Sequence, residues 1–185
     1  NKLFIIIQEA KHLVLYSFKL IDDLIEKDDI LKIELLQDKT IFSTSNQHLF
    51  VNSKDKFYII DILSYKILIR ENKICKAIET FLFPNLELTV VAHKIVEIYD
   101  GNLNIRQQID LLNIDIIRFS DSYLILGNTK NNIIHILALN HDGLFIEFGK
   151  ISHLKNISQL HCVNNMIIVN NSKEYLYVKL PQRIY

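Results

Sequence analysis

A unit of about forty residues recurs five times in this chain, and this repeat constrains the fold more than any other feature of the sequence. Each unit holds a short apolar segment, a polar turn and a second apolar segment. The second segments begin at Leu13, Phe57, Ile95, Ile133 and Tyr175. Because the spacing stays close to forty residues, we expect one supersecondary structure to be repeated five times.

The residue types of the repeat favour strands over helices. Ile, Val, Phe and Tyr dominate the apolar segments, and these side chains pack well on a pleated surface. Asn, Ser, Asp and Lys fill the turns, where Asn also replaces Gly at positions of positive φ. Only residues 20–27 show helical spacing, so we expect two helical turns there and an outer strand at 30–36 after them.

Further strand-like segments flank each unit. Outer strands are predicted at 64–69, 104–109 and 144–148, and inner strands at 77–82, 114–119 and 157–161. Four short strands per repeat make one antiparallel blade, so the sequence predicts an all-β fold, a β-propeller of about five recognisable four-stranded blades. We expect a single domain with approximate blade boundaries at 1–36, 37–72, 73–111, 112–151 and 152–185.

Three of the units resemble the WD repeat. Ile59-Ile60-Asp61 and Ile98-Tyr99-Asp100 occupy the place of its terminal Trp-Asp step, and Leu126-Gly127-Asn128-Thr129 resembles its small-residue turn. The chain has no Trp and no Gly-His pair at a blade start, so the buried Asp-His-Ser-Trp network of that family cannot be carried over. Other propeller families, a β-sandwich and an irregular solenoid fit the same periodicity.

The number of units does not determine how the ring of blades closes. Five units are fewer than the seven that the WD-repeat resemblance implies. The first lacks an inner strand before Leu3, and the last ends soon after its second strand. The chain is then a small ring, part of a larger or incomplete ring, or a ring that a partner closes. We favour the last two, because a propeller normally closes its ring and open sheet edges invite aggregation.

The sequence offers no candidate for catalytic, cofactor-binding or metal-binding residues. Its seven His residues are scattered without metal-ligand spacing, and its four Gly residues do not cluster into a phosphate-binding loop. Cys75 and Cys162 form no CxxC pair and are expected to be free thiols in a reducing compartment. We therefore expect no enzymatic activity, no cofactor and no small-molecule substrate.

Charge gives one local candidate for binding. The formal net charge is zero, which argues against nucleic acid as the main partner. One unit and its exit nevertheless carry a basic stretch in which Tyr58 and Tyr65 are interleaved, and this stretch predicts a contact to RNA or to an acidic protein unless it is only a solvated blade edge. Its members are Lys54, Lys56, Lys66, Arg70, Lys73 and Lys76.

Together these features predict a non-catalytic scaffold that binds other protein subunits of a complex, as the WD-repeat resemblance implies. Phe145, Phe148, Tyr175 and Tyr177 are candidate aromatic anchors. The alternative is an accessory subunit of an RNA-handling complex, such as ribosome assembly or tRNA modification. No apolar run approaches the ~20 residues of a membrane span and no signal peptide is visible, so we expect an intracellular protein, cytoplasmic or nuclear.

Overall fold

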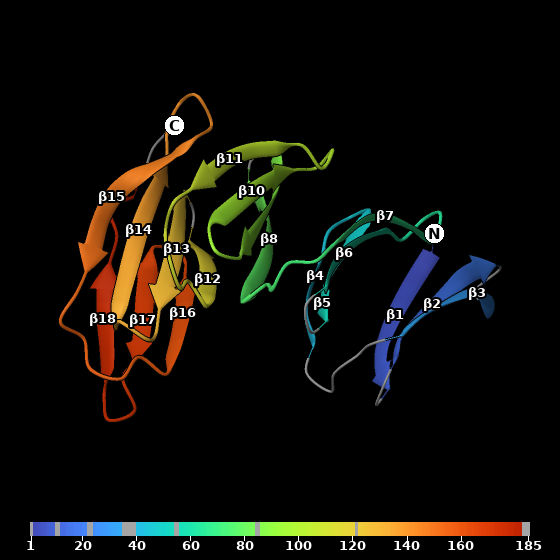
Figure 1. Cartoon of the computed structure of the whole chain (residues 1–185), viewed down its shortest axis with the longest axis horizontal. Helices are drawn as coiled ribbons and strands as arrows, with labels where there is room; N and C mark the ends of the chain where they lie inside the picture. Colours follow the sequence, from blue (N-terminus) through green and yellow to red (C-terminus); the bar gives the residue numbers. More distant parts are fainter. Residues whose placement is uncertain are drawn as a thin grey trace.

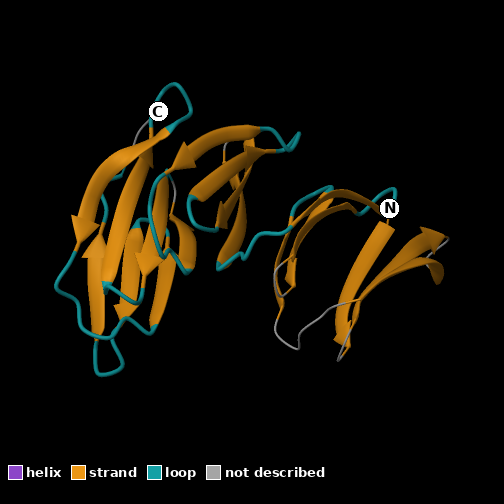
Figure 2. Ribbon diagram, in the orientation of Figure 1, coloured by secondary structure: helices purple, strands orange, loops and turns teal. Residues whose placement is uncertain are grey.

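The computed structural model describes residues 2–182 apart from 10–11, 22–23, 35–39, 54–55, 84–85 and 121. All regular structure in these residues is β-strand, in five antiparallel sheets that follow one another in chain order (Figures 1 and 2). We number the sheets 1 to 5 along the chain. The described part of the chain holds no helix that is long and apolar enough to cross a membrane.

Sheets 2, 3 and 4 have four strands each, and sheets 1 and 5 have three. Sheet 1 consists of β1 (Lys2–Glu9), β2 (His12–Ile21) and β3 (Leu24–Glu34). Sheet 2 consists of β4 (Thr40–Thr44), β5 (His48–Ser53), β6 (Lys56–Asp61) and β7 (Lys66–Glu71). Sheet 3 consists of β8 (Ala77–Phe83), β9 (Leu86–Ala92), β10 (Val96–Asp100) and β11 (Ile105–Ile109).

The same order continues in the last two sheets. Sheet 4 consists of β12 (Ile116–Ser120), β13 (Tyr123–Asn128), β14 (Ile133–Leu139) and β15 (Phe145–Ile151). Sheet 5 consists of β16 (Gln159–Val163), β17 (Met166–Asn170) and β18 (Tyr175–Lys179). The all-β prediction is confirmed, and the predicted inner and outer strands of the later units lie within about three residues of the observed ones.

Sheet 1 corrects one part of the prediction. The helix expected at 20–27 is wrong, because β2 continues to Ile21 and β3 begins at Leu24. Leu20 is paired with Ile25 and Ile21 with Leu24, so strand pairing outweighs the weak helical spacing of this stretch. The outer strand expected at 30–36 therefore starts earlier, and residues 35–36 lie outside the described residues.

The core lies between the sheets rather than inside any one of them. In β13, Leu124 and Leu126 face sheet 3, where they pack with Val90, whereas Ile125 faces sheet 5 and packs with Ile167. Because both faces of sheet 4 are covered at this strand, every residue of β13 is buried, and its first four residues, 123–126, form a continuous apolar run instead of an alternating one. Similar clusters join sheet 1 to sheet 2 and sheet 2 to sheet 3.

One polar position recurs where the third strand of a sheet turns into the fourth. The Asp61 side chain accepts hydrogen bonds from two backbone amides of its turn, at 2.8 and 2.9 Å, and Asp100 does the same at 2.9 and 2.9 Å. Asn140 takes this role in sheet 4 through its Oδ1 atom, at 3.0 and 2.9 Å. The Asp of the WD-like step therefore caps the turn to the outer strand.

Asn at positions of positive φ is the other recurrent turn feature. Four asparagines adopt φ between 53° and 59°, in the left-handed region where a side chain is usually unfavourable. This confirms that Asn replaces Gly in several of the turns, as the scarcity of Gly in the sequence suggested. These residues are Asn113, Asn132, Asn156 and Asn164.

The turn cap allows a direct test. We expect Asp100→Ala to lower the free energy of unfolding by about 1 kcal/mol, because two backbone amides lose their acceptor. Asp100→Asn should change it little, since Asn140 fills the equivalent place in sheet 4. Urea unfolding of the wild type and both variants measures this, and equal losses in the two variants would contradict the capping role.

Candidate functional site

The structure does not gather the predicted basic residues into one exposed surface. Lys54 lies outside the described residues. Lys73 and Lys76 lie in the connector between β7 and β8, where Lys73 is half-buried and Lys76 is exposed. Lys73 Nζ is 2.7 Å from Glu71 Oε2, and Lys76 Nζ donates to Asn113 Oδ1 at 3.0 Å.

The remaining cations lie on sheet 2. Lys56 is half-buried, whereas Lys66 and Arg70 on β7 are exposed, and in the described part of the chain no carboxylate forms an ion pair with either of these two. The Arg70 guanidinium lies 5.8 Å from the Tyr58 ring centroid. Tyr58 is buried and Tyr65 packs against the core, so neither ring is exposed as a platform for stacking a base. An RNA contact stays a prediction.

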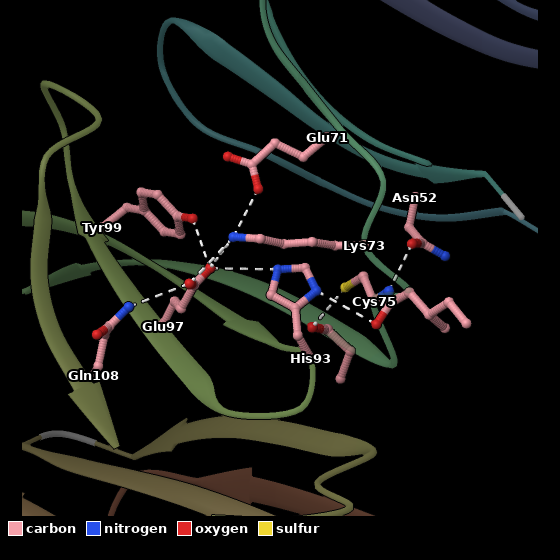
Figure 3. A network of polar contacts seen from close by, with 10 residues as sticks. Asn52, Glu71, Lys73, Cys75, His93, Glu97, Tyr99 and Gln108 are labelled. Carbon is pink, nitrogen blue, oxygen red and sulfur yellow. Dashed lines mark hydrogen bonds and ion pairs between the residues drawn. The ribbon is translucent and has the colours of Figure 1, made fainter. Parts of the chain in front are cut away.

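Lys73 belongs to a polar network that sequence reasoning missed, and Figure 3 shows it from close by. Its centre is Glu97 on β10, only 4% exposed. Lys73 Nζ lies 3.2 Å from both oxygens of this carboxylate, and the Tyr99 hydroxyl donates to Oε2 at 2.8 Å. Strand alternation explains part of the geometry, because Glu97 and Tyr99 lie on the same face of β10.

Two further side chains complete the network around Glu97. Gln108, its cross-strand partner on β11, donates from Nε2 to Oε1 at 3.4 Å. His93, in the turn before β10, brings Nε2 within 3.5 Å of Oε2, a distance typical of an ion pair but without the geometry of a hydrogen bond. Its Nδ1 lies 3.4 Å from the Ile74 carbonyl oxygen in the connector, and its ring packs edge-on against Phe57.

The charges of the network follow from burial and contact. Burial alone would raise the pKa of Glu97, but the Tyr99 hydroxyl and the Lys73 ammonium outweigh it and lower that pKa. Burial lowers the pKa of His93, against the pull of the nearby carboxylate, so the imidazole is neutral at neutral pH. Burial and Glu97 raise the pKa of Tyr99, which keeps its hydroxyl protonated as the donor.

This arrangement joins two sheets. Lys73 and Ile74 tie the connector to sheet 3, and Asn52 Oδ1 on β5 ties it to sheet 2 by accepting from the Cys75 amide at 2.8 Å. Burial raises the pKa of the Cys75 thiol to about 12, so this thiol is not an activated nucleophile. In the residues that the structure describes, no group of three or more His, Cys, Asp or Glu side chains could hold a metal ion.

Sheets 1 and 5 each leave one face uncovered in the described part of the chain. The open face of sheet 1 is the face turned away from sheet 2, and the exposed side chains on β1 are Leu3, Ile5 and Ile7. The open face of sheet 5 is the face turned away from sheet 4, where Val163, Met166, Tyr175 and Tyr177 are exposed.

Three of the four predicted aromatic anchors are exposed, and one is buried. Tyr175 and Tyr177 are 58% and 62% exposed, so both are accessible to a partner. Phe148 is also exposed and contacts the Tyr123 ring edge-on, with ring centroids 5.2 Å apart. Phe145 as an anchor is wrong, because it is buried in the core between sheets 3 and 4.

No protein-family model matches the chain, and no curated protein matches it by sequence. Solved structures match its fold. Hsv2 of Kluyveromyces lactis has a TM-score of 0.62 at 12% identity, over 95% of this chain and 57% of that one. Hsv2 of Kluyveromyces marxianus gives 0.59 at 16% identity, over 94% and 54%. A functionally unknown protein of Desulfotomaculum acetoxidans gives 0.63 at 14% identity, over 97% and 62%.

These similarities confirm the β-propeller fold, since the Hsv2 structures are propellers. At such low identity they show the fold alone. The chain spans between 54% and 62% of the length of these three neighbours. Activities and partners of the neighbours are therefore not carried over to this chain.

The Glu97 network gives a prediction for stability. We expect Glu97→Gln to lower the free energy of unfolding by about 2 kcal/mol, because the hydrogen bond to Tyr99 weakens and Lys73 loses a buried counter-charge. Glu147→Gln, at an exposed position of β15, is the matched control and should change it little. Chemical unfolding of both variants measures the difference. A similarly small loss of unfolding free energy in both would exclude Glu97 as the centre of the contact between sheets 2 and 3.

The pKa of His93 gives a prediction for pH. Because its folded pKa lies below the unfolded value of 6.5, acidification protonates the unfolded chain first, and stability should fall as the pH decreases through this unfolded value. Burial lowers the pKa of His135 as well, so this residue contributes in the same direction. We expect the slope of stability against pH to decrease in His93→Gln and further in His93→Gln/His135→Gln. An unchanged slope in the double variant would contradict this origin.

Proposed function

We propose that this chain is a non-catalytic, WD-repeat-like scaffold that binds other protein subunits of a complex. The observation that carries the proposal is the pair of open faces on sheets 1 and 5. The sheets between them bury both faces of their central strands against neighbours, whereas these two leave one face with exposed Ile, Leu, Val, Met and Tyr side chains. Exposed apolar surface of this kind is typical of protein–protein contacts.

The composition of the open faces supports a protein as the occupant. Aliphatic side chains on β1 offer a flat apolar surface, and exposed Tyr rings on β18 combine a large apolar area with a polar hydroxyl. The open face of sheet 1 also carries Lys27, whose Nζ lies 5.1 Å from the Tyr16 ring centroid. A partner surface with apolar residues and some carboxylates fits this pattern.

The non-catalytic part of the proposal rests on how the polar groups are used. Glu97, the buried carboxylate at the centre of the polar network, links sheet 3 to the connector from sheet 2. The WD-like part rests on Asp61 and Asp100, which cap turns at the place of the Trp-Asp step. Free Cys75 and Cys162 agree with a reducing, intracellular compartment, cytoplasmic or nuclear.

RNA is the second candidate partner, in an accessory subunit of an RNA-handling complex. One observation favours it: Lys66 and Arg70 project from an outer strand without a carboxylate partner among the described residues. The ion pairs of Lys73 with Glu71 and Glu97 reduce the basic surface that the sequence suggested.

The scaffold role is tested by changing an open face alone. We expect Ile5→Ser/Ile7→Ser to fold like the wild type, since both side chains are exposed on β1. The amount of the proteins that co-purify with the tagged protein from its own cells should fall at least about tenfold relative to the wild type. Quantitative mass spectrometry of the purified material measures this loss.

The matched control is Ile105→Ser/Ile146→Ser, which removes two Ile side chains that are equally exposed but lie on the outer strands β11 and β15. It should keep the same proteins. Equal recovery from both double variants would overturn the proposal, and loss of the wild-type partners on ribonuclease treatment would favour the RNA-handling alternative.

A further inference from the structure

Connectors and turns meet at one end of sheets 3, 4 and 5. The connector that leads into each sheet lies beside the turn between its second and third strands. In sheet 3, His93 Nδ1 lies 3.4 Å from the Ile74 carbonyl oxygen, and in sheet 4 the Thr129 amide donates to Asp115 Oδ1 at 3.0 Å. We call this end the connector face. It comprises residues 72–76, 93–95, 110–115, 129–132, 152–158 and 171–174.

Hydrogen bonds between successive sheets make the connector face continuous. Lys76 Nζ donates to Asn113 Oδ1 at 3.0 Å, which joins the connectors that lead into sheets 3 and 4. The Ile157 amide donates to Asn132 Oδ1 at 2.9 Å, which joins sheet 4 to the connector that leads into sheet 5. The exposed side chains of these segments therefore lie on one surface.

Lysine is concentrated on the connector face. Five of its lysines are exposed, and none of them forms an ion pair with a carboxylate among the residues that the structure describes. Its exposed carboxylates are those of Asp110 and Glu174. The described turns at the opposite end contain no Lys or Arg, so a chain of zero net charge carries a basic face. The five exposed lysines are Lys76, Lys94, Lys130, Lys155 and Lys173.

Two aliphatic side chains lie among these lysines. Ile74 is 65% exposed and Leu112 is 63% exposed. The connectors that carry them are anchored, because the neighbouring Cys75 is buried and Asn128 Nδ2 donates to the Leu112 carbonyl oxygen at 3.0 Å. Exposed aliphatic groups beside lysines that lack a carboxylate partner suit a ligand that brings apolar and acidic groups together.

The residue types of the connector face favour a protein ligand over RNA or a lipid surface. The segments that form it contain no Phe, Tyr or Trp and no Arg. Single-stranded RNA needs aromatic or Arg planes on which its bases stack, and proteins that lie on membranes use aromatic side chains at the interface. Arg matches the geometry of phosphate, whereas Lys is a point charge that a carboxylate of a protein can approach.

We propose that the connector face binds an acidic segment of a partner protein, in which apolar side chains lie between Asp and Glu residues. The carboxylates of this segment contact Lys94 and Lys130, and its apolar side chains cover Ile74 and Leu112. The site goes beyond the proposed scaffold role, because that role rests on the open faces of sheets 1 and 5. Binding weakens as salt rises, since ions screen exposed charges.

A labelled synthetic peptide of Asp, Glu and Leu tests the site by fluorescence anisotropy at low salt. The wild type should bind it at least about tenfold more tightly than the same peptide with Asn and Gln in place of the acids. Lys94→Glu/Lys130→Glu should raise the dissociation constant at least about tenfold. Lys66→Glu/Lys150→Glu is the matched control, because it changes the net charge equally at exposed positions of β7 and β15, and it should bind like the wild type.

Two further variants separate this site from other surfaces. Ile74→Ser/Leu112→Ser should weaken peptide binding at least about threefold without removing its salt dependence. Ile5→Ser/Ile7→Ser, which tests the scaffold role, should bind the peptide like the wild type, so either proposal can fail alone. Equal binding of the acidic and neutral peptides or equal losses in the two lysine variants would overturn the proposal. Tighter binding of the wild type to oligouridylate or to phosphatidylserine vesicles than to the peptide would overturn it as well.

Discussion

Burial of both faces of each inner sheet is the constraint on which the rest of this structure depends. A sheet with apolar side chains on both faces must bury them against other elements of the fold. Here Leu124 and Ile125, neighbours on β13, pack into two different cores because they point to opposite faces. Each core is thus shared by two sheets, so the burial of one sheet depends on its neighbours.

The same constraint explains where polar groups enter the interior. The connector between sheets 2 and 3 carries backbone amides and a Lys side chain into a region that is otherwise apolar. Glu97 engages the Lys73 side chain and Asn52 accepts from the Cys75 amide, so a charged residue in the strand Val96–Asp100 stabilises the contact between the two sheets instead of disrupting it. The interface between sheets 2 and 3 therefore combines apolar packing with a specific polar contact.

The repeat determined most of what could be predicted. Alternating and continuous apolar segments located the strands, since periodicity is a local signal that a single sequence contains. The helix expected at 20–27 is wrong because Leu20 and Ile25 pair across a hairpin whose register is set along the whole length of β2 and β3, outside the short window that suggested a helix. The basic stretch looked like one surface because the sequence does not show that Lys73 reaches back to Glu97. A Glu between Val96 and Ile98, two residues before Tyr99, was the available signal for the network.

Packing between successive sheets also has a consequence for synthesis of the protein. Each sheet is made from strands that are neighbours in sequence, so its hydrogen bonds form within about forty residues of chain. A sheet can therefore assemble while the ribosome is still making the next one, and the order of folding follows the order of translation. Until the next sheet arrives, the newest one presents an unburied apolar face, which is the state that chaperones would recognise.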